Sequence, residues 1–358
     1  MNWKNKVLIL LVGLLAFGGA FFSRNASRAQ QQIPPKASVT PTPETEEDTE
    51  VLKIDTEVVN VLFTAQDKNR RLLTDLKQED IKLLEDGVPQ EITAFGRQVD
   101  LPLSLAILID TSASQERTLP EEKSAAKSFI ESVVRPAKDE VSVISFTGDA
   151  TLEQGMTSNV AKLQRAIDRV QFVPPSGYVG GGVVVGTPPI SGGNQMMQGS
   201  TAIWDAIFVT SDEVLGPAPE KTRRAIILLT DGINTYGRKK LDEAVQAAIK
   251  AEAVIYSIGI GDSFQQGVDE GSLRKISERT GGRAFFPRDE AELRKAFQQI
   301  QIEMRSQYLI AYEPVNQRRD GSFRTIEIQL ASSELQKQKV NLTHRKGYFA
   351  KTDKPDKK

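Results

Sequence analysis

The chain has 358 residues, 39% of them hydrophobic, which is enough for two or three domains with a sizeable buried core. Its formal net charge of −1 excludes the basic surface of a nucleic-acid-binding protein. There is no cysteine, and His344 is the single histidine. Disulfides, zinc–thiolate sites, histidine-dependent triads and multi-histidine metal centres are therefore excluded.

The first 29 residues have the organisation of a secretory signal. Lys4 and Lys6 precede a mostly apolar run, residues 7–22, and small residues around Ala29 offer a cleavage site. A membrane-spanning helix normally needs roughly 20 apolar residues. We therefore expect an exported protein that is periplasmic, secreted or at the cell surface. An uncleaved leader that tethers the chain to a membrane through residues 7–22 is the second interpretation.

Four further segments precede and follow the middle of the chain. Residues 30–50, rich in Pro, Thr and Glu, predict a solvated linker. Residues 51–99 show the period-two alternation of β-strands, with Asp86-Gly87 as a hairpin turn. Residues 306–350 return to the same alternation, and 351–358 form a charged tail. Neither β segment can build a two-sheet core alone, so we predict that they pair into one small β-sandwich.

Residues 102–305 alternate buried strand runs with helical ones. The runs SLAILID, VSVISF, AIILLT and VIYSIGI lack the polar alternation of a sheet that faces solvent on one side. Runs with helical spacing separate them, as at Leu163, Ile167 and Val170, and another follows them at Leu293, Phe297 and Ile300. The pattern predicts an α/β fold with a doubly wound, mostly parallel, Rossmann-like sheet that is covered by helices on both faces.

A segment dense in glycine and proline, residues 174–199, interrupts this alternation. A structureless loop of that length within a domain is either a functional binding loop or a disordered spacer. Because it ends just before Thr201, we interpret it as a specificity loop or lid, with the spacer as the alternative. Tyr178, Met196 and Met197 within it have no core to join, and they are candidates for contact with a partner.

Polar oxygen-bearing side chains follow two of the predicted strands and start one predicted helix. In an open α/β sheet, ligands bind beyond the carboxyl ends of the strands, so these side chains are expected at one edge. Ligation by oxygen alone, with only two carboxylates, suits a hard cation such as Mg²⁺, with Mn²⁺ or Ca²⁺ as substitutes. The predicted metal ligands are Asp110, Ser112, Ser114, Thr201 and Asp231.

The D-x-S-x-S at 110–114, the threonine of GSTAIWDAI and the aspartate of TDG resemble the metal-ion-dependent adhesion site (MIDAS) of von Willebrand factor type A domains. The β segments on either side further resemble exported bacterial proteins in which such a domain is embedded in a β module. The resemblance implies a non-enzymatic adhesion or assembly module in which the open metal position accepts a Glu or Asp carboxylate of a protein partner. It also implies that Ser112 and Ser114 bind the metal directly, Thr201 directly or through water, and Asp110 and Asp231 largely through water.

Several alternatives compete with this interpretation. A strand-end aspartate followed by serines also occurs in plain capped turns, so the prediction depends on three turns together. Glu121 and Glu122 are interpreted as the usual acidic preference of a helix start, and Asp205 as a local hydrogen-bonding residue. The segment GIGDSFQQG lacks the spacing of a phosphate-binding loop, so no nucleotide is expected. An envelope scaffold with a loop-clamping metal is the main alternative function, and a metal-dependent hydrolase is less favoured.

Overall fold

The computed structural model describes residues 58–97, 100–174, 200–219, 222–261 and 267–353. The leader, the linker and almost all of the Gly/Pro-rich segment lie outside these ranges. The candidate partner-contacting residues Tyr178, Met196 and Met197 therefore lie outside the described residues as well.

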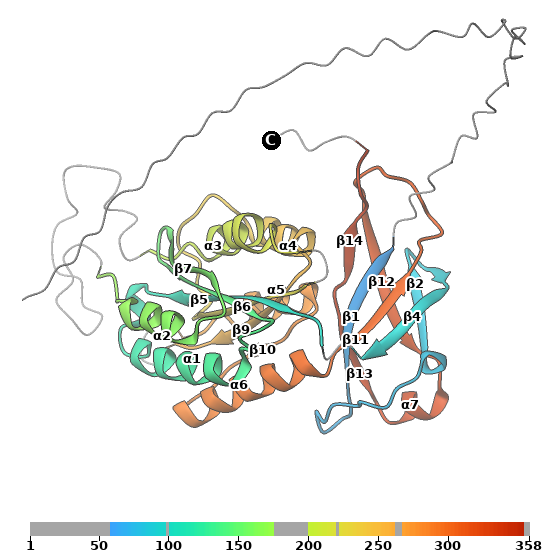
Figure 1. Cartoon of the computed structure of the whole chain (residues 1–358), viewed down its shortest axis with the longest axis horizontal. Helices are drawn as coiled ribbons and strands as arrows, with labels where there is room; N and C mark the ends of the chain where they lie inside the picture. The colour runs from blue at the N-terminus through green and yellow to red at the C-terminus, as the bar shows by residue number, and fades with distance from the viewer. Residues whose placement is uncertain (1–57, 98–99, 175–199, 220–221, 262–266, 354–358) are drawn as a thin grey trace, which may run out of the picture. The chain divides into compact units, whose positions relative to one another are not determined.

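A six-stranded sheet forms the centre of the α/β part of the chain (Figure 1). All neighbouring strands in it are parallel except β6 and β7, which pair antiparallel. The predicted doubly wound, mostly parallel sheet is thereby confirmed. In spatial order the strands are β10 (Ala284–Phe285), β9 (Ala253–Gly259), β8 (Arg223–Thr230), β5 (Leu103–Asp110), β6 (Glu140–Phe146) and β7 (Ala150–Thr157).

Helices cover both faces of this sheet (Figure 1). Successive side chains of β5 enter opposite cores: Ile107 packs with one set of helices and Leu108 with the other. This two-sided burial explains why the strand runs carry no polar alternation. One face holds α1 (Leu119–Val133), α2 (Val160–Arg169) and α6 (Glu290–Arg305); the other holds α3 (Ile203–Val209), α4 (Leu241–Lys250) and α5 (Glu270–Thr280).

The N-terminal and C-terminal β segments combine into two four-stranded antiparallel sheets around one core. Each sheet contains strands from both segments, as predicted for a sandwich, and a short helix, α7 (Ser333–Lys337), follows β12. One sheet has the order β13 (Asn341–His344), β1 (Val59–Gln66), β11 (Tyr308–Tyr312) and β4 (Ile92–Arg97). The other has the order β14 (Gly347–Phe349), β12 (Phe323–Leu330), β2 (Ile81–Glu85) and β3 (Val88–Gln90).

The predicted hairpin turn lies between β2 and β3. Asp86 and Gly87 both have positive φ, 48° and 80°, which is the geometry of the two-residue hairpin turn that the Asp-Gly pair favours. The antiparallel edge strand β7 was not predicted. Its sequence ATLEQGMT is mostly polar because its residues are exposed or half-buried, so no apolar periodicity marks it.

Buried polar contacts fix the sandwich against the α/β part. Glu303 of α6 accepts a hydrogen bond from Gln66 of β1 at 3.0 Å and forms an ion pair with Arg283 at 2.7 Å. Arg223, the first residue of β8, donates to the carbonyl oxygens of Met304 and Leu101, which precede β11 and β5. Among the helices in the described ranges, none is long and apolar enough to span a bilayer.

Candidate metal site

The candidate site lies at the carboxyl ends of β5 and β8, where the strand order reverses. From β5 the chain proceeds outward to β6 and β7, then returns to place β8, β9 and β10 on the other side. Such a switch point leaves a crevice beyond the strand ends, because the two connections leave in opposite directions. Asp110 is the last residue of β5, and Asp231 follows the last residue of β8.

Four of the predicted ligands are connected by direct contacts. The backbone N–H of Ser112 donates to Asp110 Oδ1 at 2.9 Å, so the chain turns tightly around that carboxylate. The hydroxyl oxygens of Ser112 and Ser114 lie 3.2 Å apart. The Ser114 side chain also lies close enough to the Asp231 carboxylate to lower the pKa of that acid. The turn after β5 and the turn after β8 therefore present their oxygens to one another.

Thr201 is attached to the same region through its main chain. Its N–H donates to the Thr235 hydroxyl at 2.8 Å, and its carbonyl oxygen accepts from the N–H groups of Thr235 and Tyr236 at 3.0 and 3.1 Å. These bonds hold the segment before α3 against the loop that follows Asp231. Thr201 is buried, and a segment far away in sequence thus reaches the strand-end region.

Asp205 has the local role expected of it. Its two carboxylate oxygens accept from the backbone N–H groups of Arg238 and Lys239, both at 3.1 Å. Gly237 permits this close approach: its φ is +118°, and a Cβ there would lie 2.1 Å from Asp205 Oδ2. Both carboxylate oxygens of Asp205 therefore accept hydrogen bonds from the loop after Asp231 and hold that loop in place.

Thr230 belongs to the site although the sequence analysis did not single it out. Its hydroxyl donates to Asp110 Oδ2 at 2.6 Å, across the parallel pairing of β8 with β5. This bond fixes the second oxygen of Asp110, while Ser112 fixes the first. The signal was present as the threonine of LLTDG, but only the strand neighbourhood gives it a partner.

The surroundings of the two carboxylates of the site raise their pKa values. Burial raises the pKa of Asp110 to about 7, and the nearby charge of Asp231 adds to this effect. Burial also raises the pKa of Asp231, against the lowering effect of the Ser114 side chain. Burial disfavours the ionised forms of both acids, and a bound cation stabilises those ionised forms. The raised pKa values therefore favour a cation beside Asp110 and Asp231.

The donor chemistry fits a hard divalent cation. All candidate donors are carboxylate or hydroxyl oxygens, which Mg²⁺, Mn²⁺ and Ca²⁺ accept. No group of three or more His, Cys, Asp or Glu side chains in the described ranges is placed to hold a metal. A cation at this edge therefore depends on the serine and threonine hydroxyls in addition to Asp110 and Asp231.

Glu122 corrects the interpretation of the acidic start of α1. Glu121 is exposed, as expected, but Glu122 is fully buried, and its carboxyl oxygens have no hydrogen-bond partner among the described residues. Burial raises its pKa to about 8, and the charges of Asp110 and Asp231 contribute. The sequence held a signal: Glu122 precedes Ala126 and Phe129 at helical spacing, which places it on the apolar stripe of α1.

Comparison with known proteins finds similarities in the part of the chain around this site. Two family models, each described as von Willebrand factor type A domain, match residues 105–234 and 190–299. No curated protein gives a significant match.

Solved structures that match part of this chain come from a mussel and from bacteria. Proximal thread matrix protein 1 from the mussel byssus, with a zinc-occupied MIDAS motif, is 22% identical with a TM-score of 0.46, over 62% of this chain and 50% of that one. The chain thus spans about half the length of the mussel protein. An aerotolerance-related membrane protein of Bacteroides fragilis is 18% identical with a TM-score of 0.42, and the match covers 56% of this chain and 100% of that one. A von Willebrand factor type A structure from Catenulispora acidiphila is 14% identical, TM-score 0.45, over 85% and 76%.

Proposed function

Because two von Willebrand factor type A models match parts of residues 105–299, we propose that the protein is an exported binding module that captures a partner protein through a divalent cation. The observation that supports this most directly is the contact between the turns after β5 and β8. Ser112 and Ser114 approach each other at 3.2 Å, and Ser114 reaches Asp231. The cation is Mg²⁺ in this proposal, with Mn²⁺ or Ca²⁺ able to replace it.

The proposed ligand set explains how such a site would recognise a carboxylate. With only two acids of its own, the site leaves a bound cation electron-poor and one coordination position open for an outside anionic oxygen. An Asp or Glu side chain of a partner supplies that oxygen. The residues that would hold the cation are Asp110, Ser112, Ser114, Thr201 and Asp231.

The surroundings of the site favour a protein partner over a catalytic reaction. Among the residues that the structure describes, no nucleophile and base pair accompanies the five oxygen donors. Neither a nucleotide nor a nucleic acid is expected as ligand. The Gly/Pro-rich segment ends directly before Thr201, so we propose that it contributes to partner specificity through Tyr178, Met196 and Met197. The leader directs export, and residues 7–22 serve as a membrane tether wherever the leader is retained.

The proposal is tested by affinity capture from an envelope extract, with Mg²⁺ and with EDTA. The baits are wild type, Asp110→Ala, and Asp149→Ala as a matched control that removes an exposed acid from a turn outside the cluster. We expect one partner to be retained by wild type and by the control in Mg²⁺, and to be lost with EDTA or with Asp110→Ala. Calorimetric titration with Mg²⁺ measures the ion site separately from the partner.

The scaffold alternative gives the opposite result in the same experiment. If the cation only clamps loops, EDTA lowers the stability of the domain, whereas any captured partner stays bound in all conditions. A partner that Asp110→Ala retains as well as wild type would therefore reject cation-mediated recognition.

A further inference from the structure

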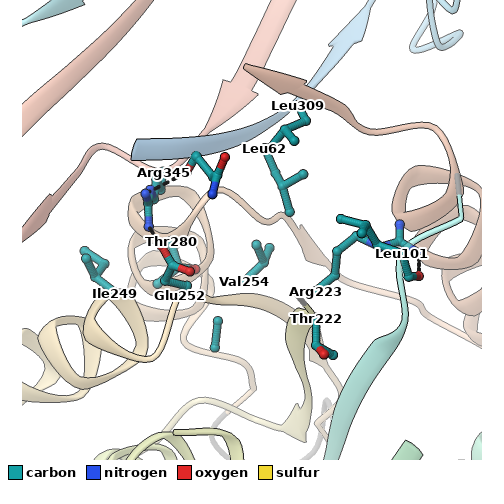
Figure 2. A pocket seen from close by; sticks show the side chains of 12 residues that line it. Leu62, Leu101, Thr222, Arg223, Ile249, Glu252, Val254, Thr280, Leu309 and Arg345 are labelled. Carbon is teal, nitrogen blue, oxygen red and sulfur yellow. Dashed lines mark hydrogen bonds and ion pairs between the residues drawn. The ribbon is translucent and has the colours of Figure 1, made fainter. Parts of the chain in front are cut away.

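A cleft runs between the α/β sheet and the sandwich, at the end of the sheet opposite to the candidate metal site. Its inner part is a cavity of about 290 Å³ that lies where β8 and β9 begin (Figure 2). Leu62 of β1 and Leu309 of β11 close it from the sandwich, and Val254 of β9 lies across from them. Apolar side chains make up half of the lining of this inner part, and Arg223, Glu252 and Arg345 are among the other half.

The cleft widens outward into a second cavity of about 660 Å³. The two cavities share Asn60, Ile249, Glu252 and Arg345, so they adjoin one another along these residues. Strand β14 and the residues after it line the outer part, up to Thr352. An elongated molecule could therefore place one end in the inner part and the other end in the outer part.

The outer part is strongly basic. Its charged lining residues are four bases and one acid: Arg224, Lys250, Arg345 and Lys351 against Glu252. Glu252 pairs with Arg345 at 3.2 Å and lies 3.7 Å from Arg224, so both arginines share a single carboxylate. The whole chain carries a net charge of only −1, so the lining of the outer part is more basic than the chain as a whole.

The arginines of the cleft are fixed in place yet incompletely partnered. Arg224 Nη2 donates to the carbonyl oxygen of Ala218 at 2.7 Å, and Arg345 Nη2 to that of Asn60 at 2.7 Å. Nevertheless the Nε atoms of Arg223, Arg224 and Arg345 have no hydrogen-bond acceptor in the described ranges. Arg223 and Arg224 are only 6% and 8% exposed, so this charge is held away from bulk water. Buried, immobilised guanidinium groups with too few acceptors are a preorganised environment for an anion.

We infer that this cleft is a binding site for a straight-chain fatty carboxylate. The acid headgroup lies among Arg224, Lys250, Arg345 and Lys351, and the alkyl chain enters the inner cavity. The size of the inner cavity suits one alkyl chain and excludes a two-chain lipid. Charge complementarity selects an anionic headgroup.

Calorimetric titration of the full chain with octanoate and decanoate, below their micellar concentrations, tests the inference. Each additional buried methylene strengthens binding about fourfold, so decanoate should bind about 15-fold more tightly than octanoate, with one molecule per chain. Decyltrimethylammonium has the same chain length with the opposite charge, and we expect no saturable binding. Equal binding of this cation would overturn the inference, because the cleft would then select alkyl chains alone.

Variants at the mouth of the cleft locate the site. Lys250→Gln combined with Lys351→Gln removes two exposed charges without disturbing the core, and it should weaken decanoate binding about tenfold. The matched control, Lys162→Gln combined with Lys295→Gln, makes the same change in net charge on the exposed sides of α2 and α6. We expect it to bind like wild type. Equal affinities of the two double variants would refute the location.

One further ligand and one core variant complete the test. Decyl phosphate distinguishes the headgroup: saturable binding of decyl phosphate without binding of decanoate would refute the carboxylate assignment. Leu62→Trp fills the inner cavity, and circular dichroism checks that the variant is folded. In a folded Leu62→Trp variant, decanoate should no longer bind about 15-fold more tightly than octanoate. An unchanged ratio of the two affinities would place the alkyl chain elsewhere.

Discussion

Replacement of Glu122 by Gln should stabilise the protein in EDTA at alkaline pH. The Glu122 carboxyl is fully buried and has no hydrogen-bond partner among the described residues, so its ionised form is disfavoured in the fold. Its pKa rises from the ordinary 4.5 to about 8, chiefly because of burial. Glutamine keeps the shape of the side chain and removes the charge.

The sign of the effect follows from proton binding. Below pH 4.5 both the folded and the unfolded protein hold the Glu122 proton, and the substitution changes little. Between pH 4.5 and 8 the folded protein keeps a proton that the unfolded chain has lost, so its free energy of unfolding falls as pH rises, by about 1.4 kcal/mol per pH unit. Over the whole interval this amounts to at most about 5 kcal/mol. Water that enters from the adjoining cavity near α6 lowers the cost of ionising Glu122 in the folded protein. We therefore expect Glu122→Gln to raise the free energy of unfolding by about 2 kcal/mol at pH 9.

Urea unfolding in EDTA, from pH 5 to pH 9, measures this difference. The wild type should lose stability relative to Glu122→Gln as pH rises, because the variant lacks the titrating group. Glu121→Gln is the matched control, since it removes the same charge from the exposed neighbouring position. If the curves of Glu122→Gln and wild type run parallel across this range, Glu122 is not held neutral by burial, and the argument fails.

Three other predictions concern the metal site, the sandwich core and a close backbone approach. Mg²⁺ should raise the melting temperature more at pH 8 than at pH 6, because the cation competes with a proton on Asp110, whose pKa is about 7, and Asp110→Asn should abolish the increment in differential scanning fluorimetry. Glu85→Ala should cost about 3–5 kcal/mol in urea unfolding, because it leaves the buried charge of Arg324 without its carboxylate; retention of wild-type stability would contradict this. Gly282→Ala should cost about 1–3 kcal/mol, since its Cβ would lie 2.0 Å from a backbone carbonyl oxygen, whereas Gly96→Ala meets nothing within 4 Å and should be tolerated.

The polar core of the sandwich shows how far sequence patterns extend. Alternation around Ile328 predicted a strand with one buried face, and β12 has that pattern. The same face also buries Arg324, which lies near Glu85 at 3.4 Å, while Tyr312 donates to that carboxylate at 2.7 Å. The alternation predicts that Arg324 faces the core. It does not predict that Glu85 of another strand lies close enough to pair with the buried charge of Arg324.

The candidate metal site was predictable to the extent that it depends on strand ends. Asp110 and Asp231 each follow an apolar run, and parallel strands bring such ends to one edge. Thr230 and Glu122 were not recognised, because their roles come from neighbours on other elements. Thr230 meets Asp110 only through the pairing of β8 with β5, and Glu122 is buried only because α1 packs on the sheet.

The sequence by itself determined the fold class, the hairpin at Asp86-Gly87 and the candidate oxygen donors, since periodicity and turn chemistry are properties of short segments. Tertiary structure alone decided which charges lie together. The basic cleft joins Arg224 to Arg345, and the strands around it come from both ends of the described chain. Burial, raised pKa values and unmatched charge depend on the segments that meet in space, and no local pattern encodes them.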